Sequence, residues 1–98
     1  MTKRRIDRLR EKMEVQALIV TDQTNIRYLT GYRGDNGVLL VTEERATLIT
    51  DPRYEESSNR EVRGAEIVIT NDGILEKLVT LSQFRKIKKA GFERENIR

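Results

Sequence analysis

Carboxylate side chains are the main groups in this sequence that could perform metal or acid–base chemistry. The chain contains neither histidine nor cysteine, which excludes nucleophile–imidazole triads and the usual zinc sites. Carboxylates alone can still hold Mg²⁺ or Mn²⁺. Most of them occupy positions typical of helix caps or solvated faces, and nothing pairs two of them in one cleft. We therefore expect no catalytic residue and no metal site here, although the candidates are Asp22, Asp35, Asp51, Glu55, Glu56 and Asp72.

The glycine-rich segment 31–37, Gly-Tyr-Arg-Gly-Asp-Asn-Gly, is the second candidate. A phosphate-binding loop runs from a strand into a helix, whereas this segment is expected to run from a short helix into a strand. We expect Gly31 to end that helix, and Gly34 and Gly37 to allow positive φ. An exposed loop of this kind is a reasonable contact surface. The side chains expected to form it are Tyr32, Arg33, Asp35 and Asn36.

Hydrophobic patterning predicts the elements that would position these residues. The three polar residues 43–45 are too few for a crossover, so the strands on either side should form an antiparallel hairpin. The fold class is therefore α/β: a three-layer-like mixed sheet of about five strands, with one antiparallel hairpin in an otherwise parallel sheet. Strands are expected at 17–21, 38–42, 46–50, 65–69 and 86–93. Helices are expected at 3–14, at 26–30 after the capping segment 22–25, from the Asp51-Pro52 start to about residue 62, and at 73–84 capped by Asn71 or Asp72.

Length and charge suit one small domain. The chain has 98 residues and a net charge of +3. Residues 1–12 carry six basic and two acidic groups, as do residues 85–98, so each end contributes +4 and the middle is acidic. No apolar run approaches the roughly 20 residues that cross a bilayer, and the absence of cysteine is compatible with the cytoplasm.

Five short segments, in the same order, resemble the N-terminal domain of the creatinase/prolidase/aminopeptidase P family. The most distinctive is Asn-Ile-Arg-Tyr-Leu-Thr-Gly-Tyr at 25–32. Each segment alone is weak, whereas five in register are specific. The segments are 17–21, 25–32, 37–42, 48–54 and 91–93, with the Arg-Leu pair at 8 and 9 in addition.

The resemblance implies a ribonuclease-H-like arrangement of strands. In the family this domain precedes a pita-bread catalytic domain that binds two divalent metals, often Mn²⁺. Residues 1–98 would then be the N-terminal domain, stopping short of its C-terminal end, with the catalytic domain and every metal ligand outside the chain. The parent protein would be a cytoplasmic metallopeptidase, an Xaa-Pro aminopeptidase or dipeptidase. This chain alone would be inactive.

The resemblance also implies partners and a role for the loop. The partners would be the protein's own catalytic domain, a second subunit in a homodimer and a proline-containing peptide substrate. Segment 31–37 would shape or gate the substrate cleft, whereas Arg53 and Tyr54 are explained by helix packing and an ion pair. The alternative is a free-standing basic α/β module that binds nucleic acid or a protein partner. The scarcity of aromatic residues among the basic ones disfavours nucleic acid.

Overall fold

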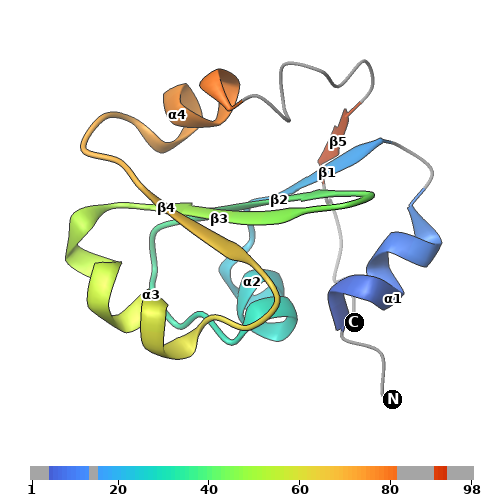
Figure 1. The fold of residues 1–98 in the computed structure, drawn as a ribbon, viewed down its shortest axis with the longest axis horizontal. Helices are drawn as coiled ribbons and strands as arrows, with labels where there is room; N and C mark the ends of the chain where they lie inside the picture. The colour runs from blue at the N-terminus through green and yellow to red at the C-terminus, as the bar shows by residue number, and fades with distance from the viewer. Residues whose placement is uncertain (1–4, 14–15, 82–89, 93–98) are drawn as a thin grey trace.

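Five strands and four α-helices make up the described part of the chain in the computed structural model, which covers residues 5–13, 16–81 and 90–92 (Figure 1). Their order matches the order expected from the sequence. In chain order they are α1 (Arg5–Lys12), β1 (Ala17–Val20), α2 (Gln23–Thr30), β2 (Val38–Thr42), β3 (Ala46–Thr50), the 3₁₀ turn η1 (Pro52–Tyr54), α3 (Glu55–Glu61), β4 (Glu66–Ile69), α4 (Ile74–Thr80) and β5 (Ala90–Phe92). Among these residues no helix is long and apolar enough to cross a membrane.

The strands form one mixed sheet in the order β4-β3-β2-β1-β5. Strand β2 pairs antiparallel with β1 and β3, while β3–β4 and β1–β5 are parallel pairs. Only β2 therefore runs against the other four, and the predicted α/β sheet with its β2–β3 hairpin is confirmed. Helices α1, α2 and α3 lie on one face and α4 on the other, which gives three layers (Figure 1).

Alternating side chains of the central strands fill two cores. In β2, Leu39 points into the core under α1 and α2, whereas Leu40 points into the core under α4, and both are at most 1% exposed. Strand β1 alternates in the same way, with Val20 in the first core and Ile19 in the second. A strand covered on both faces reads as a continuous apolar run, which explains the pattern of residues 17–20.

Local capping signals fix both ends of α2. The carboxylate of Asp22 accepts a hydrogen bond from the backbone N–H of Asn25 at 3.0 Å. At the other end, Gly31 adopts the left-handed conformation with φ 87°, and its N–H donates to the carbonyl of Arg27 at 2.8 Å. The expected terminator is confirmed. The cap is Asp22, the first residue of the expected capping segment 22–25, so α2 begins at Gln23, three residues earlier than expected.

The helix α4 departs from expectation at both ends. Its N-cap is Gly73, which makes no side-chain cap hydrogen bond, so neither Asn71 nor Asp72 caps it. The backbone N–H of Asp72 instead donates a hydrogen bond to the hydroxyl of Thr70 at 3.1 Å, in the turn before the helix. The helix ends at Thr80, because Leu81 has an extended backbone. The expected continuation to residue 84 lies outside the described residues.

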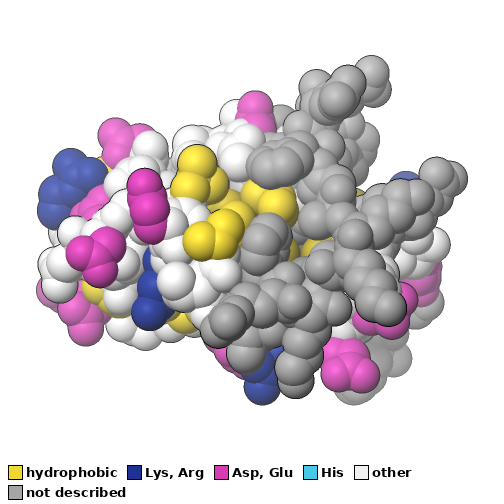
Figure 2. Space-filling model, turned by 90° about the horizontal axis from the view of Figure 1, so that it is seen from above, with side chains coloured by type: hydrophobic (Ala, Val, Ile, Leu, Met, Phe, Trp, Pro, Cys, Tyr) yellow, Lys and Arg dark blue, Asp and Glu magenta, His cyan; other side chains and the backbone are white. Residues whose placement is uncertain are grey.

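The apolar face predicted for α4 is only partly buried. Leu78 packs into the core with 3% of its surface exposed, whereas Leu75 and Val79 are 56% and 55% exposed. One helix of seven residues cannot turn all of a broad apolar face toward the sheet. Figure 2 views this face of the molecule and shows hydrophobic side chains gathered near its centre.

Candidate functional site

The loop 31–37 is built around the side chain of Tyr32. This side chain is 1% exposed, so the expectation that it lies on the surface is wrong. Its hydroxyl donates to the backbone carbonyl of Asn36 at 2.7 Å and lies 2.9 Å from the hydroxyl of Thr50. Burial raises the pKa of Tyr32, so the phenol stays neutral and serves as a hydrogen-bond donor. The residue folds the loop back onto the sheet and does not contact solvent.

The two inner glycines of the loop make room for this ring. A Cβ atom at Gly34 would overlap the Tyr32 hydroxyl. A Cβ atom at Gly37 would lie 3.2 Å from the Tyr32 ring and 3.3 Å from the carbonyl of Ile49. Neither glycine has positive φ, so the reason expected for them is wrong. Glycine is required at Gly34 by close approach to Tyr32.

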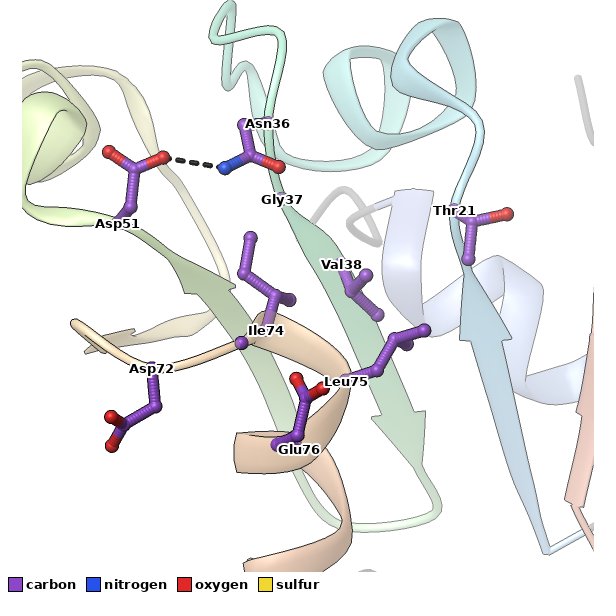
Figure 3. A pocket seen from close by; sticks show the side chains of 10 residues that line it. Thr21, Asn36, Gly37, Val38, Asp51, Asp72, Ile74, Leu75 and Glu76 are labelled. Atoms are coloured by element: carbon purple, nitrogen blue, oxygen red, sulfur yellow. Dashed lines mark hydrogen bonds between the residues drawn. The ribbon is translucent and has the colours of Figure 1, made fainter.

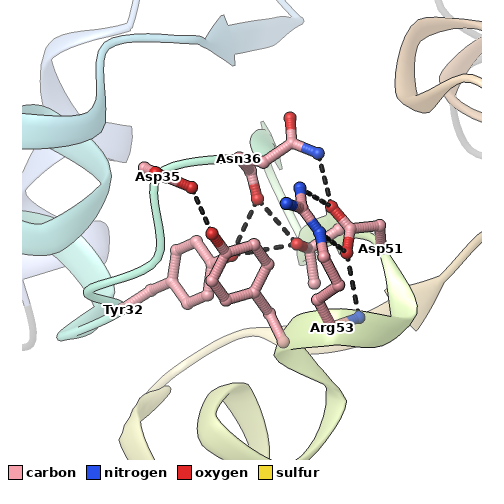
Figure 4. A network of polar contacts seen from close by, with 7 residues as sticks. Tyr32, Asp35, Asn36, Asp51 and Arg53 are labelled. Carbon is pink, nitrogen blue, oxygen red and sulfur yellow. Dashed lines mark hydrogen bonds and ion pairs between the residues drawn. The ribbon is translucent and has the colours of Figure 1, made fainter.

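A polar network joins the loop to the start of η1 (Figure 4). The amide of Asn36 donates to Asp51 at 2.5 Å, and the guanidinium of Arg53 contacts both oxygens of Asp51 at 3.0 and 2.9 Å. The hydroxyl of Tyr54 donates to the carboxylate of Asp35. The expected ion pair of Arg53 is therefore present, and the two loop residues are held by side chains from a segment 15 or more positions away.

Electrostatics keep the centre of this network ionised. The hydrogen bond from Arg53, with a second from Asn36, holds the pKa of Asp51 well below its usual range. The same contact raises the pKa of Arg53. The Asp51 carboxylate also caps η1 through the backbone N–H of Arg53 at 2.9 Å. A carboxylate with every oxygen engaged in this way is unsuited to general acid–base catalysis at neutral pH.

The four residues expected to form the contact surface have different environments. Asp35 and Asn36 come together with Asp51 in the network, whereas Tyr32 lies beneath them in the core. Arg33 is exposed and is fixed through its backbone N–H, which donates to the carboxylate of Glu61 at 3.0 Å. The loop therefore offers Arg33 and Asp35 to solvent from a rigid support.

An open hollow of about 480 Å³ lies between the end of this loop and the start of α4 (Figure 3). Its lining includes the acidic residues Asp51, Asp72 and Glu76, beside the apolar residues Ile74 and Leu75. It lies at the edge of the sheet where β1, β3 and β4 have their carboxyl ends, which is the usual position of ligand crevices in α/β sheets. This hollow was not predicted from the sequence, although the polar residues that directly follow these strands were a usable signal.

The described residues contain no group of three or more His, Cys, Asp or Glu side chains that could hold a metal ion. Of the carboxylates considered from the sequence, Asp51 and Asp72 line the same hollow, so the expectation that no two of them share a cleft is wrong. The others are dispersed. Asp22 caps α2, and Asp35 binds Tyr54. Glu55 and Glu56 lie in the first turn of α3, where the helix dipole favours them. A two-metal centre does not fit the described part of this chain.

The fold is a three-layer α/β domain with a mixed five-stranded sheet, and the loop 31–37 is joined to the end of β3 by a polar network. Residues 5–98 match the model of the Creatinase/Prolidase N-terminal domain, and the chain belongs to that family. The expected family is thus confirmed, and with it the fold.

Proteins similar to this chain are peptidases. It is 29% identical over 86 residues to the "uncharacterized peptidase YqhT" of Bacillus subtilis (strain 168), which covers 88% of this chain and 24% of that protein. The aminopeptidase P, an Xaa-Pro aminopeptidase, from Streptococcus thermophilus is 33% identical with a TM-score of 0.76, over 90% of this chain and 68% of that one. The N-terminal domain of the cytoplasmic peptidase PepQ from Mycobacterium tuberculosis H37Rv is 33% identical with a TM-score of 0.80, over 91% and 72%. The chain thus spans about a quarter of the length of its curated relative.

Proposed function

We propose that this chain is the non-catalytic N-terminal domain of a metal-dependent Xaa-Pro peptidase of the aminopeptidase P or prolidase type. The family match over residues 5–98 carries the proposal, together with the small share of the curated peptidase that the chain spans. The parent protein would be a hydrolase, and residues 1–98 would lack its catalytic domain. This part of the chain would be inactive alone.

The metal centre belongs to the catalytic domain in this proposal. Two divalent ions, with Mn²⁺ as the expected species, would activate the water that attacks the peptide bond. In this proposal the N-terminal domain supplies no metal ligand. A cytoplasmic location and a homodimer complete the proposal. The similarity to a protein described as a cytoplasmic peptidase favours that location.

The loop 31–37 would wall or gate the cleft that receives proline-containing peptides. Its support favours this role, because a contact residue is effective only when its backbone is held in place. Tyr32 and the Asn36–Asp51 contact hold the loop, while Arg33 and Asp35 remain at the surface. A guanidinium and a carboxylate at the cleft edge would select short peptides by their terminal charges.

A hydrolysis assay tests the assignment. Xaa-Pro peptides are incubated with Mn²⁺ and either the 98-residue chain or the longer parent protein. We expect cleavage only by the longer protein. Cleavage by the 98-residue chain would contradict a non-catalytic domain. Absence of cleavage by the folded, metal-loaded parent would contradict the peptidase assignment.

Two substitutions in the parent protein test the loop. Arg33→Ala and Asp35→Ala should change the Michaelis constant or the preferred peptide length by roughly fivefold to tenfold, as expected for loss of one charged contact. Arg60→Ala removes an equal charge from the exposed surface of α3 and serves as the matched control. Unchanged kinetics in both loop variants would exclude the loop from the cleft.

A further inference from the structure

A second, basic hollow lies apart from the loop network, where the start of α1, the end of α2 and the segment after α3 meet. Its volume is about 280 Å³, and it shares no lining residue with the hollow beside α4. Three arginines line it, and none of the described residues that line it is acidic. The lining residues are Arg5, Arg27, Tyr28, Leu29, Thr30, Gly31 and Arg63.

The protein itself positions two of these arginines. The guanidinium of Arg5 donates to the carbonyl of Tyr28 at 2.8 Å and lies over the ring of the same residue, 4.2 Å from its centroid. Arg63 donates from its backbone N–H to the carbonyl of Thr30 at 2.8 Å, and its side chain donates to two carbonyls of its own segment. Each guanidinium carries five N–H donors, so these contacts leave others for a ligand.

The positive charge of the hollow is not neutralised within the described part of the chain. None of the ion pairs among the described residues includes Arg5, Arg27 or Arg63. Glu61, the acidic residue nearest in sequence to Arg63, does not line the hollow, and its carboxylate accepts the backbone N–H of Arg33. Like charges gathered around a hollow without counter-charge are favourable for an anion.

We propose that this hollow binds a carboxylate group. A guanidinium matches the two oxygens of a carboxylate in a bidentate arrangement, and Tyr28 and Leu29 supply apolar surface for the adjoining carbon atoms. A singly charged carboxylate suits the site better than a phosphate dianion, because the negative end of the α2 dipole is at Gly31. The carboxylate could be the C-terminus of a peptide or the side chain of Asp or Glu in a protein segment.

Titration of the ¹⁵N-labelled 98-residue chain with short peptides tests the proposal and distinguishes the two sources. One probe is acetyl-triglycine with a free C-terminal carboxylate, and the second is acetyl-Gly-Glu-Gly amide, which carries only a side-chain carboxylate. Acetyl-Gly-Gln-Gly amide is the uncharged control, and inorganic phosphate is the competing anion. We expect a carboxylate probe, but not the uncharged control, to shift the backbone amide signals of Arg27, Gly31 and Arg63.

Substitutions then assign the binding to the arginines. Arg27→Gln should weaken the binding of the carboxylate probe by roughly tenfold, which corresponds to one charge-assisted contact. This side chain makes no hydrogen bond and no ion pair to the described residues in the free protein, so the variant should fold normally. Arg60→Gln, which removes the same charge on α3 outside the hollow, should bind as the wild type does.

Three results would overturn the inference: no shift of these amides with either carboxylate probe, equal weakening by Arg27→Gln and Arg60→Gln, or tighter binding of phosphate than of both peptides. Binding of the carboxylate probe by Arg63→Gln provides a second test, and an unfolding curve verifies that this variant folds. The result does not depend on the peptidase assignment, because no catalytic domain takes part. Failure of this binding would leave the hydrolysis assay unaffected.

Discussion

The hydroxyl of Tyr32 occupies the space that a Cβ atom at Gly34 would fill, although the two residues belong to the same short loop. The loop closes over the ring of Tyr32 and returns at Asn36, whose carbonyl accepts the Tyr32 hydroxyl at 2.7 Å. Because Tyr32 is buried and hydrogen-bonded, its ring cannot move aside at low cost. The shape of the loop therefore requires both the side chain of Tyr32 and the lack of a side chain at Gly34.

Gly34→Ala should destabilise the domain by about 1–3 kcal/mol, the usual range for overpacking a filled site. Gly73→Ala is the matched control. The three atoms nearest to its Cβ atom would all belong to the exposed, flexible side chain of Glu76, and its φ of −67° suits alanine. The free energy of unfolding, measured by urea denaturation of the three proteins, distinguishes them. Equal stability of the two variants would contradict the prediction, because it would mean that the Tyr32 ring moves aside at little cost.

Tyr32→Phe should lower the free energy of unfolding by about 1 kcal/mol, the typical net value of one buried hydrogen bond. The loss is limited, because the carbonyl of Asn36 keeps its hydrogen bond from Thr50 at 2.6 Å. Tyr54→Phe, whose hydroxyl contacts Asp35 nearer the surface, should cost less. Thermal unfolding followed by circular dichroism gives both values. A larger loss of unfolding free energy in Tyr54→Phe than in Tyr32→Phe would contradict the conclusion that the Tyr32 hydroxyl is the one that holds the loop.

The Asp51–Arg53 pair predicts a loss of stability in acid. The pKa of Asp51 is lower in the folded protein than its unfolded value of about 3.9, so its contribution is present above pH 4 and is lost as the pH falls below it. Asp51→Asn keeps a residue able to cap η1 while removing the charge. The urea midpoint of this variant should change less than that of the wild type between pH 6 and pH 2.

Asp72→Asn is the control for this comparison. Asp72 is exposed and forms no ion pair among the described residues, and its substitution removes the same formal charge. Its urea midpoint should therefore follow the wild-type dependence on pH. If Asp51→Asn also follows the wild-type curve, the Asp51–Arg53 pair contributes nothing measurable to the pH dependence of stability, which is common for exposed ion pairs.

The exposed apolar side chains of α4 predict self-association of the 98-residue chain at high concentration. Leu75 and Val79 lie one turn apart and are each more than half exposed. Leu75→Lys should lower the average mass measured by light scattering at millimolar concentration. Thr80→Lys adds the same charge on the same helix and is the control. A monomeric wild-type chain, or equal effects of the two substitutions, would exclude this face as the cause.

The sequence by itself determined the elements that depend on neighbouring residues. Strands 38–42 and 46–50 were predicted with the bounds that the structure shows, because a short apolar run and a three-residue polar turn are local signals. The Gly31 terminator and the Asp51-Pro52 start were also correct, and the α2 cap fell within the expected segment 22–25, since each depends on contacts within about four residues. The family followed from the order of five short segments.

Tertiary structure alone decided which side chains these elements bury or expose. Tyr32 looked like a surface residue of a glycine-rich loop, yet Thr50, 18 positions away, helps to bury it. The full lining of neither hollow could be predicted from spacing, because each draws its lining from three or more segments. Such arrangements depend on long-range packing, where the burial of one residue is fixed by others far along the chain, and local patterns carry little information about it.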